Sequence, residues 1–317
     1  MDNENNANAI EALKTIALEG LKEQRRARRW GIFFKLLFWG YLLIIGAIFI
    51  MGLLGTNSDD SITASEITAV VDIKGVIMDE ADASADLVIP SLRKAFANPK
   101  TKAVLLRINS PGGSPVQAGQ INDEIRRLRT LHEDIPVYAV VSDICASGGY
   151  YIAVAADKIY ADKASLVGSI GVRMDNFGFV EAMNKLGVER RLITAGENKG
   201  MLDPFLPENP KEVEHVKTLL NMTHQQFINV VKEGRGKRLK DNPDLFTGLI
   251  WTGEGAKELG LIDELGDERY VAREVVKAPT MVNFTSEKDF LDKIGEQLGT
   301  SVSQWFMQSS TPQPRMY

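Results

Sequence analysis

Ser147 precedes two glycines and an apolar run, in the stretch CASGGYYIA at residues 145–153. Each glycine inside a helix costs about 1 kcal/mol relative to alanine, so two in succession indicate that a bare backbone is needed there. We expect a strand at 136–141 before the serine and a helix at 148–156 after it. Free N–H groups and the dipole at a helix start stabilise a serine oxygen that carries negative charge, as a nucleophile does. Ser-Gly-Gly also occurs in plain turns with serine as the N-cap, so this stretch alone fits both interpretations.

A second glycine-rich turn, INSPGGSP at residues 108–115, lies between a predicted strand at 103–108 and a predicted helix at 117–131. Its Pro-Gly-Gly core favours a turn with exposed N–H groups, and two such groups aimed at one point form an oxyanion hole. The alternative is a simple connection between strand and helix. The carboxyl ends of neighbouring parallel strands face one crevice, however, so we expect the two glycine-rich turns to meet there.

A nucleophilic serine needs a base, and histidine is the usual choice. The chain has three histidines, His132, His215 and His224, none of which adjoins a glycine-rich loop in the sequence, and we interpret all three as solvated or structural. A lysine whose pKa is lowered by burial is the other option, but composition cannot select one. The lone Cys145 is interpreted as a small buried apolar residue rather than a nucleophile.

Several function classes are disfavoured by composition. The 317 residues carry a net charge of −5, which argues against nucleic-acid binding. One cysteine excludes an intramolecular disulfide, and the histidines lack a metal-ligand spacing such as H-x-x-x-H. The glycine-rich turns do not match the phosphate-binding G-x-x-x-x-G-K-[ST] pattern. We therefore expect no metal and no other cofactor.

The elements that would position these turns alternate between strand and helix. Strands are predicted at 67–73, 103–108, 136–141, 158–162 and 189–194, and helices at 83–97, 117–131, 148–156, 210–233, 253–260 and 266–277. This alternation favours an α/β domain with a parallel, layered sheet. An apolar stripe predicts one more helix at 287–306, followed by a tail without a packing pattern.

The N-terminal region predicts a membrane anchor. Residues 36–54 contain no charge and, together with residues 30–35, are long enough to cross a bilayer as a helix. Four arginines precede this run and acidic residues follow it, which places residues 1–29 in the cytoplasm and the rest across the membrane. A cleaved signal peptide is the alternative, but its apolar core would be shorter and end at a small-residue cleavage site, so we favour a retained anchor.

Four motifs together resemble those of the signal peptide peptidase A family: INSPGGSP, ASGGYYIA, GSIGV at 168–172 and GENKG at 196–200. The resemblance covers roughly residues 67–270, in order, and corresponds to the short, single-domain form of this family. It implies a membrane-anchored serine protease with the Clp-protease/crotonase-like fold, an α/β layered arrangement of repeated ββα units, here preceded by one transmembrane helix.

The resemblance also implies a role for each matched residue. Ser147 matches the nucleophile and Lys199 the general base. Gly112 and Gly113 match the oxyanion-hole turn, to which the N–H of Gly148 would contribute. Ser169 matches a hydroxyl that orients the lysine amine.

These observations predict five regions: a cytoplasmic segment (1–29), a transmembrane anchor (30–55), a linker (56–66), a catalytic domain (67–279) and a C-terminal helix with a tail (280–317). The expected function is a serine endopeptidase with a Ser–Lys dyad in the bacterial inner (plasma) membrane, its catalytic domain extracytoplasmic (periplasmic). The resemblance implies apolar peptide substrates such as signal-peptide remnants, no nucleic-acid partner, and a homo-oligomer with sites shared between subunits. The alternatives are a non-catalytic membrane scaffold and a crotonase-type acyl-CoA enzyme.

Overall fold

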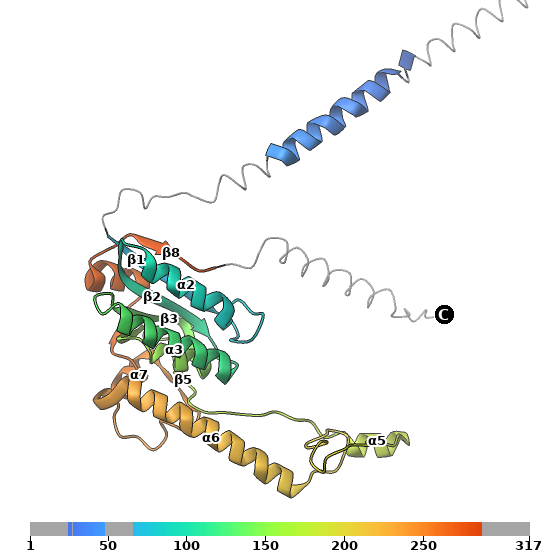
Figure 1. Ribbon diagram of the computed structural model, residues 1–317, viewed down its shortest axis with the longest axis vertical. Helices are drawn as coiled ribbons and strands as arrows, with labels where there is room; N and C mark the ends of the chain where they lie inside the picture. Colours follow the sequence, from blue (N-terminus) through green and yellow to red (C-terminus); the bar gives the residue numbers. More distant parts are fainter. Residues whose placement is uncertain (1–24, 27, 48–65, 287–317) are drawn as a thin grey trace, which may run out of the picture. The chain divides into compact units, whose positions relative to one another are not determined.

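The computed structural model describes residues 25–26, 28–47 and 66–286 (Figure 1). Contacts divide the chain into two compact units, Met1–Ile62 and Thr63–Tyr317. The helix predicted at 287–306 lies outside the described residues, as does the linker predicted at 56–66 apart from Glu66. The five predicted regions therefore stay predictions.

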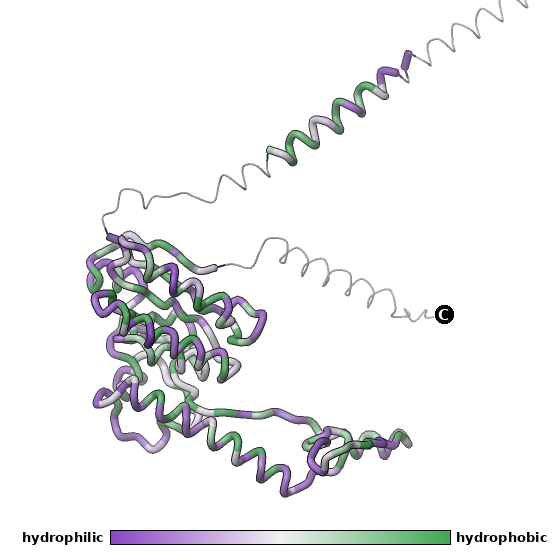
Figure 2. The backbone as a smooth tube through the Cα atoms, viewed as in Figure 1, coloured by the Kyte–Doolittle hydropathy of each residue, from purple (hydrophilic) through white to green (hydrophobic). Residues whose placement is uncertain are grey.

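In the first unit, one helix, Arg28–Ala47, has the length and composition to cross a membrane. At about 1.5 Å per residue it spans about 30 Å, the thickness of a hydrocarbon core. Its large apolar side chains are exposed along the whole described length. The hydropathy colouring of Figure 2 shows that most of this helix is hydrophobic. The helix is compatible with the predicted anchor at 30–55, of which residues 48–55 are not described.

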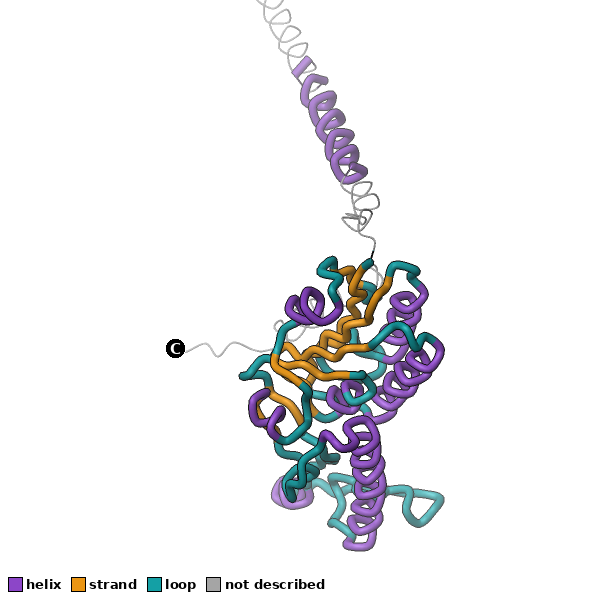
Figure 3. The backbone as a smooth tube through the Cα atoms, turned by 90° about the vertical axis from the view of Figure 1, so that its left-hand side faces the viewer, coloured by secondary structure: helices purple, strands orange, loops and turns teal. Residues whose placement is uncertain are grey.

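The second unit is built on one eight-stranded sheet (Figure 3). Its main path runs in the order β6-β5-β3-β2-β1-β8, and β4 pairs with both β3 and β7. The strands are β1 (Ile67–Lys74), β2 (Thr101–Ser110), β3 (Val137–Ala146), β4 (Lys158–Ala161), β5 (Leu166–Gly168), β6 (Ile250–Thr252), β7 (Glu264–Leu265) and β8 (Met281–Asn283). Every strand pair is parallel except β5 with β6. The predicted α/β class is thus confirmed.

The central strands are apolar on both faces because both faces are covered. On β1, Ala69, Val71 and Ile73 belong to the large core beneath α2 (Ala85–Ala97), α3 (Pro115–Leu131) and α4 (Gly148–Ala153). The intervening Val70 belongs to a smaller core on the other face, which contains Val271 and Val276 of a π-helical turn. This turn follows the short helix α8 (Glu268–Tyr270), so the helix predicted at 266–277 is present in an irregular form.

Strand β3 changes partner along its length, and this directs its end toward the site. Residues 138–141 pair with β4, whereas Ile144, Cys145 and Ala146 pair with β5. The register between β2 and β3 shifts between Ile108 and Ser110. Ser147 follows directly after the second half of β3, where the neighbouring strand is β5.

The long helix α6 (Pro210–Arg235) returns the chain to this core. Near its end the buried guanidinium of Arg235 pairs with Asp263, with Nη1 2.7 Å from Oδ2, and its Nε donates to the Gly260 carbonyl. A Cβ on Gly234 would lie 2.3 Å from the carbonyl oxygen of Val154, so only glycine allows this close approach to the chain that follows α4. The end of α6 is therefore fixed against the segment after α4 and against residues 260–263.

One predicted strand is wrong. Residues 189–194 form an exposed, irregular segment after the short helix α5 (Val180–Leu186). Their β-branched and apolar residues have the composition of a strand, but no neighbouring strand pairs with them, and β-propensity depends on such a partner. The short strands β5, β6, β7 and β8 and the helix α5 had no clear sequence signal.

Candidate active site

Ser147 occupies a backbone conformation that is rare for a residue with a side chain, with φ 52° and ψ −120°. Two hydrogen bonds impose it: the Ser147 N–H donates to the Gly168 carbonyl at 2.9 Å, and the Tyr151 N–H donates to the Ser147 carbonyl at 2.9 Å. Strain of this kind persists where the surroundings determine it, and it is common at catalytic residues. The serine thus lies at a sharp strand–turn–helix junction between β3 and α4, a geometry typical of nucleophiles.

The two glycines after Ser147 are required by a neighbouring turn. A Cβ on Gly148 would lie 3.3 Å from the amide nitrogen of Gly113, and a Cβ on Gly149 would lie 3.0 Å from the carbonyl oxygen of Ser110. Side chains at both positions would therefore push the start of α4 away from the Pro-Gly-Gly turn. The bare backbone predicted from the sequence serves this contact.

The Pro-Gly-Gly turn leaves one N–H group available beside Ser147. The Ile77 N–H donates to the Gly112 carbonyl and the Ser114 N–H donates to the Ile77 carbonyl, so this pairing skips the Gly113 N–H. The Gly112 N–H donates to the Ser110 hydroxyl at 3.1 Å. Both glycines have positive φ, 100° and 154°. A Cβ on Gly112 would lie 2.7 Å from that of Ser147, which shows how closely the two turns pack.

The first turn of α4 supplies a second N–H group. The Tyr151 N–H makes the first intrahelical bond, so the Gly148 N–H precedes the hydrogen-bonded ladder of the helix. Gly148 adjoins both the nucleophile and Gly113. The N–H groups of Gly113 and Gly148 therefore lie in the two turns that pack together at Ser147, and they are the candidates for the pair of donors that an oxyanion hole needs.

A cavity of about 760 Å³ brings five of the six predicted site residues together. It is lined by Ser147, Gly112, Gly113, Gly148 and Ser169 and, in addition, by Val76, Pro111, Pro115, Ala118, Tyr151, Gly171, Val172, Arg173, Thr223, Gln226, Phe227, Thr247 and Gly248. Among these lining residues there is no lysine, histidine or carboxylate. Within one chain, the cavity therefore holds the serine without a general base.

Lys199, the sixth predicted residue, lies in an exposed turn in which its N–H donates to the Gly196 carbonyl at 3.1 Å. The turn belongs to residues 174–215, here called the outer segment, all of which are described and none of which is buried. Figure 1 shows α5 at the far end of α6, away from the sheet. The outer segment exposes large apolar side chains, among them Phe177 (75% exposed), Leu186 (78%) and Ile193 (95%).

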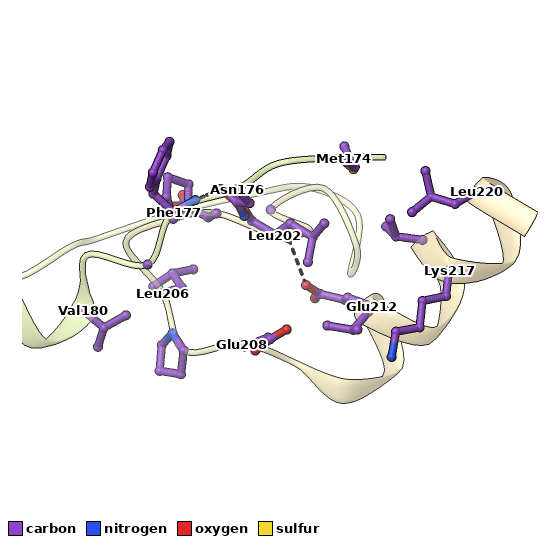
Figure 4. A pocket seen from close by; sticks show the side chains of 17 residues that line it. Met174, Asn176, Phe177, Val180, Leu202, Leu206, Glu208, Glu212, Lys217 and Leu220 are labelled. Atoms are coloured by element: carbon purple, nitrogen blue, oxygen red, sulfur yellow. Dashed lines mark hydrogen bonds between the residues drawn. The ribbon is translucent and has the colours of Figure 1, made fainter. Parts of the chain in front are cut away.

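A second cavity, of about 440 Å³, lies within the outer segment and along the start of α6 (Figure 4). One wall is held by Glu212, whose carboxylate accepts a hydrogen bond from the Leu202 N–H at 3.1 Å. An ion pair between Arg190 and Asp203 holds the same loop. Gly200 lines this cavity and follows Lys199 directly, so these contacts fix the loop that carries the lysine.

Sequence reasoning missed the wall that α6 contributes. Thr223, Gln226 and Phe227 line the cavity, and the Phe227 ring packs 5.1 Å from that of Tyr151. No local sequence pattern indicates that residues of α6, the first of them 76 positions after Ser147, line the same cavity as the serine. The same helix brings His224 to the loop after Ser169, with Nε2 3.1 Å from the Ile170 carbonyl oxygen. Although His224 is far from this glycine-rich loop in the sequence, it lies beside it in space, in keeping with the interpretation of this histidine as structural.

Cys145 is buried within the large core, and burial raises the pKa of its thiol. It does not line the cavity, which fits its interpretation as an apolar residue. Among the described residues, no group of three histidine, cysteine or carboxylate side chains could hold a metal ion.

Comparisons with known proteins indicate the family to which the chain is similar. The profile of peptidase family S49 matches residues 129–281. The chain is 33% identical over 201 residues to putative protease slr0021 of Synechocystis, covering 63% of this chain and 70% of that protein. It is 30% identical over 220 residues to the putative signal peptide peptidase SppA of Enterococcus faecium, covering 68% and 63%.

A third relative carries a different name. Over 182 residues the chain is 53% identical to a Brucella abortus protein named Na(+)/H(+) antiporter NhaA. The match covers 57% of this chain but only 25% of that protein. The name describes a protein of which three quarters have no counterpart in the match. The chain thus spans from a quarter to about seven tenths of these three relatives.

Proposed function

The chain belongs to peptidase family S49, and we propose that it is a membrane-anchored serine endopeptidase with Ser147 as nucleophile and Lys199 as general base. The family supports a protease over the scaffold and the acyl-CoA enzyme. The strained serine beside two available N–H groups supports acyl transfer as its chemistry.

In the proposed reaction, the neutral Lys199 amine takes the Ser147 hydroxyl proton as the serine oxygen attacks a peptide carbonyl. The N–H groups of Gly113 and Gly148 bind the oxyanion of the tetrahedral intermediate. The lysine ammonium then donates its proton to the leaving amine, and an acyl-enzyme forms. The same lysine then deprotonates a water that attacks the ester carbonyl, and it returns the proton to the Ser147 oxygen as the acyl–oxygen bond breaks and the peptide leaves. The Ser169 hydroxyl accepts from the lysine amine and orients it.

One observation carries the proposal that two chains share each site: the cavity of one chain holds Ser147 but no base, while Lys199 lies on the outer segment. The outer segment buries no side chain of its own and exposes several large apolar ones. Large apolar side chains that are exposed together on one segment are typical of interaction sites. We propose that the outer segment packs on a neighbouring copy and delivers Lys199 to its cavity. Head-to-tail contacts of this type form a ring where the rotation between neighbours closes and a filament where it does not, and we propose the closed ring.

We further propose that the catalytic domain is extracytoplasmic and that the helix Arg28–Ala47 anchors it in a bacterial plasma membrane. The arginines Arg25, Arg26, Arg28 and Arg29 support this orientation by the positive-inside rule. The cavity wall includes the apolar side chains of Val76, Ala118 and Phe227, which supports apolar peptides as substrates. Signal-peptide remnants that remain at the membrane fit both features.

Complementation tests the shared site. Full-length Ser147→Ala and Lys199→Ala chains are purified in detergent, mixed, and dissociated and reassembled so that subunits exchange. Activity on an apolar peptide should return, because hybrid sites contain a serine from one variant and a lysine from the other. Each variant treated alone is the control. Hybrid oligomers that form, as shown by two affinity tags, but stay inactive would place the dyad within one chain.

Labelling tests the reaction class. A serine-directed fluorophosphonate should label wild-type Ser147 and should not label the Ser147→Ala variant. A wild-type chain that assembles yet resists labelling would favour the scaffold or the acyl-CoA enzyme.

A further inference from the structure

His224 is a side-chain anchor for the loop that carries Ser169. This loop, residues 168–171, runs from the end of β5 along the cavity that holds Ser147. Two of its anchors are backbone groups: the Gly168 carbonyl accepts from Ser147 N–H, and the Ser169 N–H donates to the Leu249 carbonyl at 2.7 Å. The third is the bond between His224 Nε2 and the Ile170 carbonyl at 3.1 Å.

The loop needs such support because its conformation is unfavourable. Ser169 has φ 52°, a value uncommon for a residue with a side chain, and Gly168 before it has φ 114°. A Cβ on Gly168 would lie 2.8 Å from the Trp251 ring, so that one side of the loop is pressed against β6. The His224 ring contacts the loop from α6. Losing that contact frees the carbonyl next to Ser169, while the backbone anchors remain.

The chemistry of the bond fixes the state of the ring. A carbonyl oxygen only accepts, so Nε2 must carry a proton. The neighbours of His224 on the helix, Thr223 and Phe227, line the cavity, whereas His224 itself does not. The ring is therefore placed to hold the loop and not to accept a proton from Ser147.

We propose that His224 is a positioning residue for the peptidase reaction, which acts by holding the Ser169 hydroxyl where it orients the catalytic lysine. This inference rests on the proposed Ser–Lys mechanism. Ser169 is not itself held by a side-chain bond among the described residues, so the position of its hydroxyl depends on its backbone. A shift of about 1 Å in a group that orients a catalytic partner can cost about 100-fold in rate.

A matched pair of amides separates the bond from mere packing. Glutamine can place its amide N–H close to the position of the histidine Nε2, whereas asparagine is one methylene shorter and cannot. In full-length enzyme, His224→Gln should keep kcat within about threefold of wild type, and His224→Asn and His224→Ala should lower kcat by about 10- to 100-fold with little change in KM. Gln225→Ala, at an exposed position beside His224 on the same helix that does not line the cavity, should change neither.

A double-mutant cycle tests the route through Ser169. Because coupled residues are non-additive, His224→Ala should cost less than about threefold in a Ser169→Ala background. Equal kcat for the Gln and Asn variants, or a full cost of His224→Ala in the Ser169→Ala background, would overturn the proposal. A His224→Ala chain as inactive as Ser147→Ala, and not rescued by glutamine, would make His224 the base instead.

These experiments distinguish a failure of the positioning role of His224 from a failure of the Ser–Lys mechanism. Failure of that mechanism appears as activity in Lys199→Ala, measured in parallel. Failure of the positioning role appears as equal kcat values for His224→Gln and His224→Asn, or as a full cost of His224→Ala in the Ser169→Ala background. Both readouts hold whichever residue is the base. Thermal unfolding of each variant confirms that the compared chains are folded, and the His224→Gln and His224→Asn pair remains informative if the alanine variant does not fold.

Discussion

The environment of Ser147 and that of Lys199 differ in how a single chain determines them. Ser147 is fixed by backbone hydrogen bonds to β5 and α4 and by contacts that leave no space for a Cβ on the adjoining glycines. Lys199 lies in the outer segment, where none of residues 174–215 is buried. Ser147, the proposed nucleophile, is thus preorganised by buried contacts within one chain, whereas the loop of Lys199, the proposed base, is held by polar contacts on a segment without buried side chains.

The two positions should nevertheless be equally essential for activity. Ser147→Ala and Lys199→Ala should each lower kcat/KM by at least about 10⁴-fold, and the double variant should be hardly worse, because dyad members act as a unit. Lys199→Arg should stay inactive, since arginine cannot become neutral. Peptide hydrolysis and thermal unfolding measure these effects. Lys237→Ala, at an exposed position outside the outer segment, is the control and should retain activity. Substantial turnover by Lys199→Ala would place the base elsewhere.

The glycine-rich turn tests how tightly the Ser147 region is packed. A Cβ on Gly113 would lie 2.0 Å from the Ile77 carbonyl oxygen, so Gly113→Ala must displace the turn and its N–H group. We expect a loss of about 10²- to 10³-fold in kcat, as for the removal of an oxyanion donor, together with a lower melting temperature. The control is Gly119→Ala in α3, where a Cβ meets nothing within 4 Å and alanine is the better helix former. If Gly113→Ala retained full activity, the turn would not bind the oxyanion.

The outer segment should fail by a different route. Leu186→Asp and Ile193→Asp place charges on its most exposed apolar positions, and we expect smaller assemblies by light scattering and at least about a tenfold loss of activity at low protein concentration. Stability of the folded chain should change by less than about 0.5 kcal/mol, as for surface substitutions. Asn184→Asp, an exposed polar position in α5, should leave both unchanged. Full activity with unchanged assembly in both apolar variants would contradict a role in docking.

This difference between regions also explains what the sequence could predict. The strands and helices around Ser147 were recognisable because apolar periodicity and glycine-rich turns reflect packing within one chain. The GSIGV and INSPGGSP motifs correctly indicated residues that meet Ser147 in one cavity. Residues 189–194, by contrast, have the composition of a strand, but no neighbouring strand pairs with them in the described part of the chain. The composition of a segment does not reveal whether a pairing strand is present.

The contribution of α6 could not be predicted because it is a tertiary contact. Phe227 reaches the cavity, and His224 reaches the loop after Ser169, because α6 packs back on the core. Gly234 lies against Val154 after α4, and Arg235 binds Gly260 and Asp263. Nothing in the local pattern of a polar helix indicates such a contact. The general base likewise escaped a derivation from residues alone, and its assignment to Lys199 depends on the motif match and on the proposed assembly.

Acid should weaken the packed region through Glu124. Its carboxylate, 8% exposed, accepts hydrogen bonds from Arg127 and from Arg93, and these lower the pKa of Glu124 from 4.5 to about 2 against the opposing effect of burial. Because the folded pKa lies below the ordinary value, this stabilisation is present above about pH 4.5 and is lost as the pH falls toward 2.

Glu124→Gln should therefore lower the free energy of unfolding by about 1–2 kcal/mol at pH 7, a modest value because solvent screens the half-exposed arginines. The difference from wild type should shrink below pH 4.5. Urea unfolding across this pH range measures it. The exposed Glu274, which pairs with Arg273 and Lys277, provides the control, and Glu274→Gln should change stability less. A cost for Glu124→Gln that stayed constant from pH 7 to pH 3 would contradict the assigned pKa.

The smallest effect is expected at Cys145, only two positions from the nucleophile. Residues i and i+2 of a strand share a face, but the positive φ of Ser147 ends the strand and turns the serine into the cavity, while the thiol stays in the core. Cys145→Ala should keep activity within about threefold, its cost being a small cavity in the core. Burial raises the pKa of the thiol, so native enzyme should resist iodoacetamide at neutral pH while denatured enzyme reacts. A folded but inactive Cys145→Ala enzyme would identify the Cys145 thiol as the nucleophile. The proposed Ser–Lys site, shared between subunits, would then be wrong.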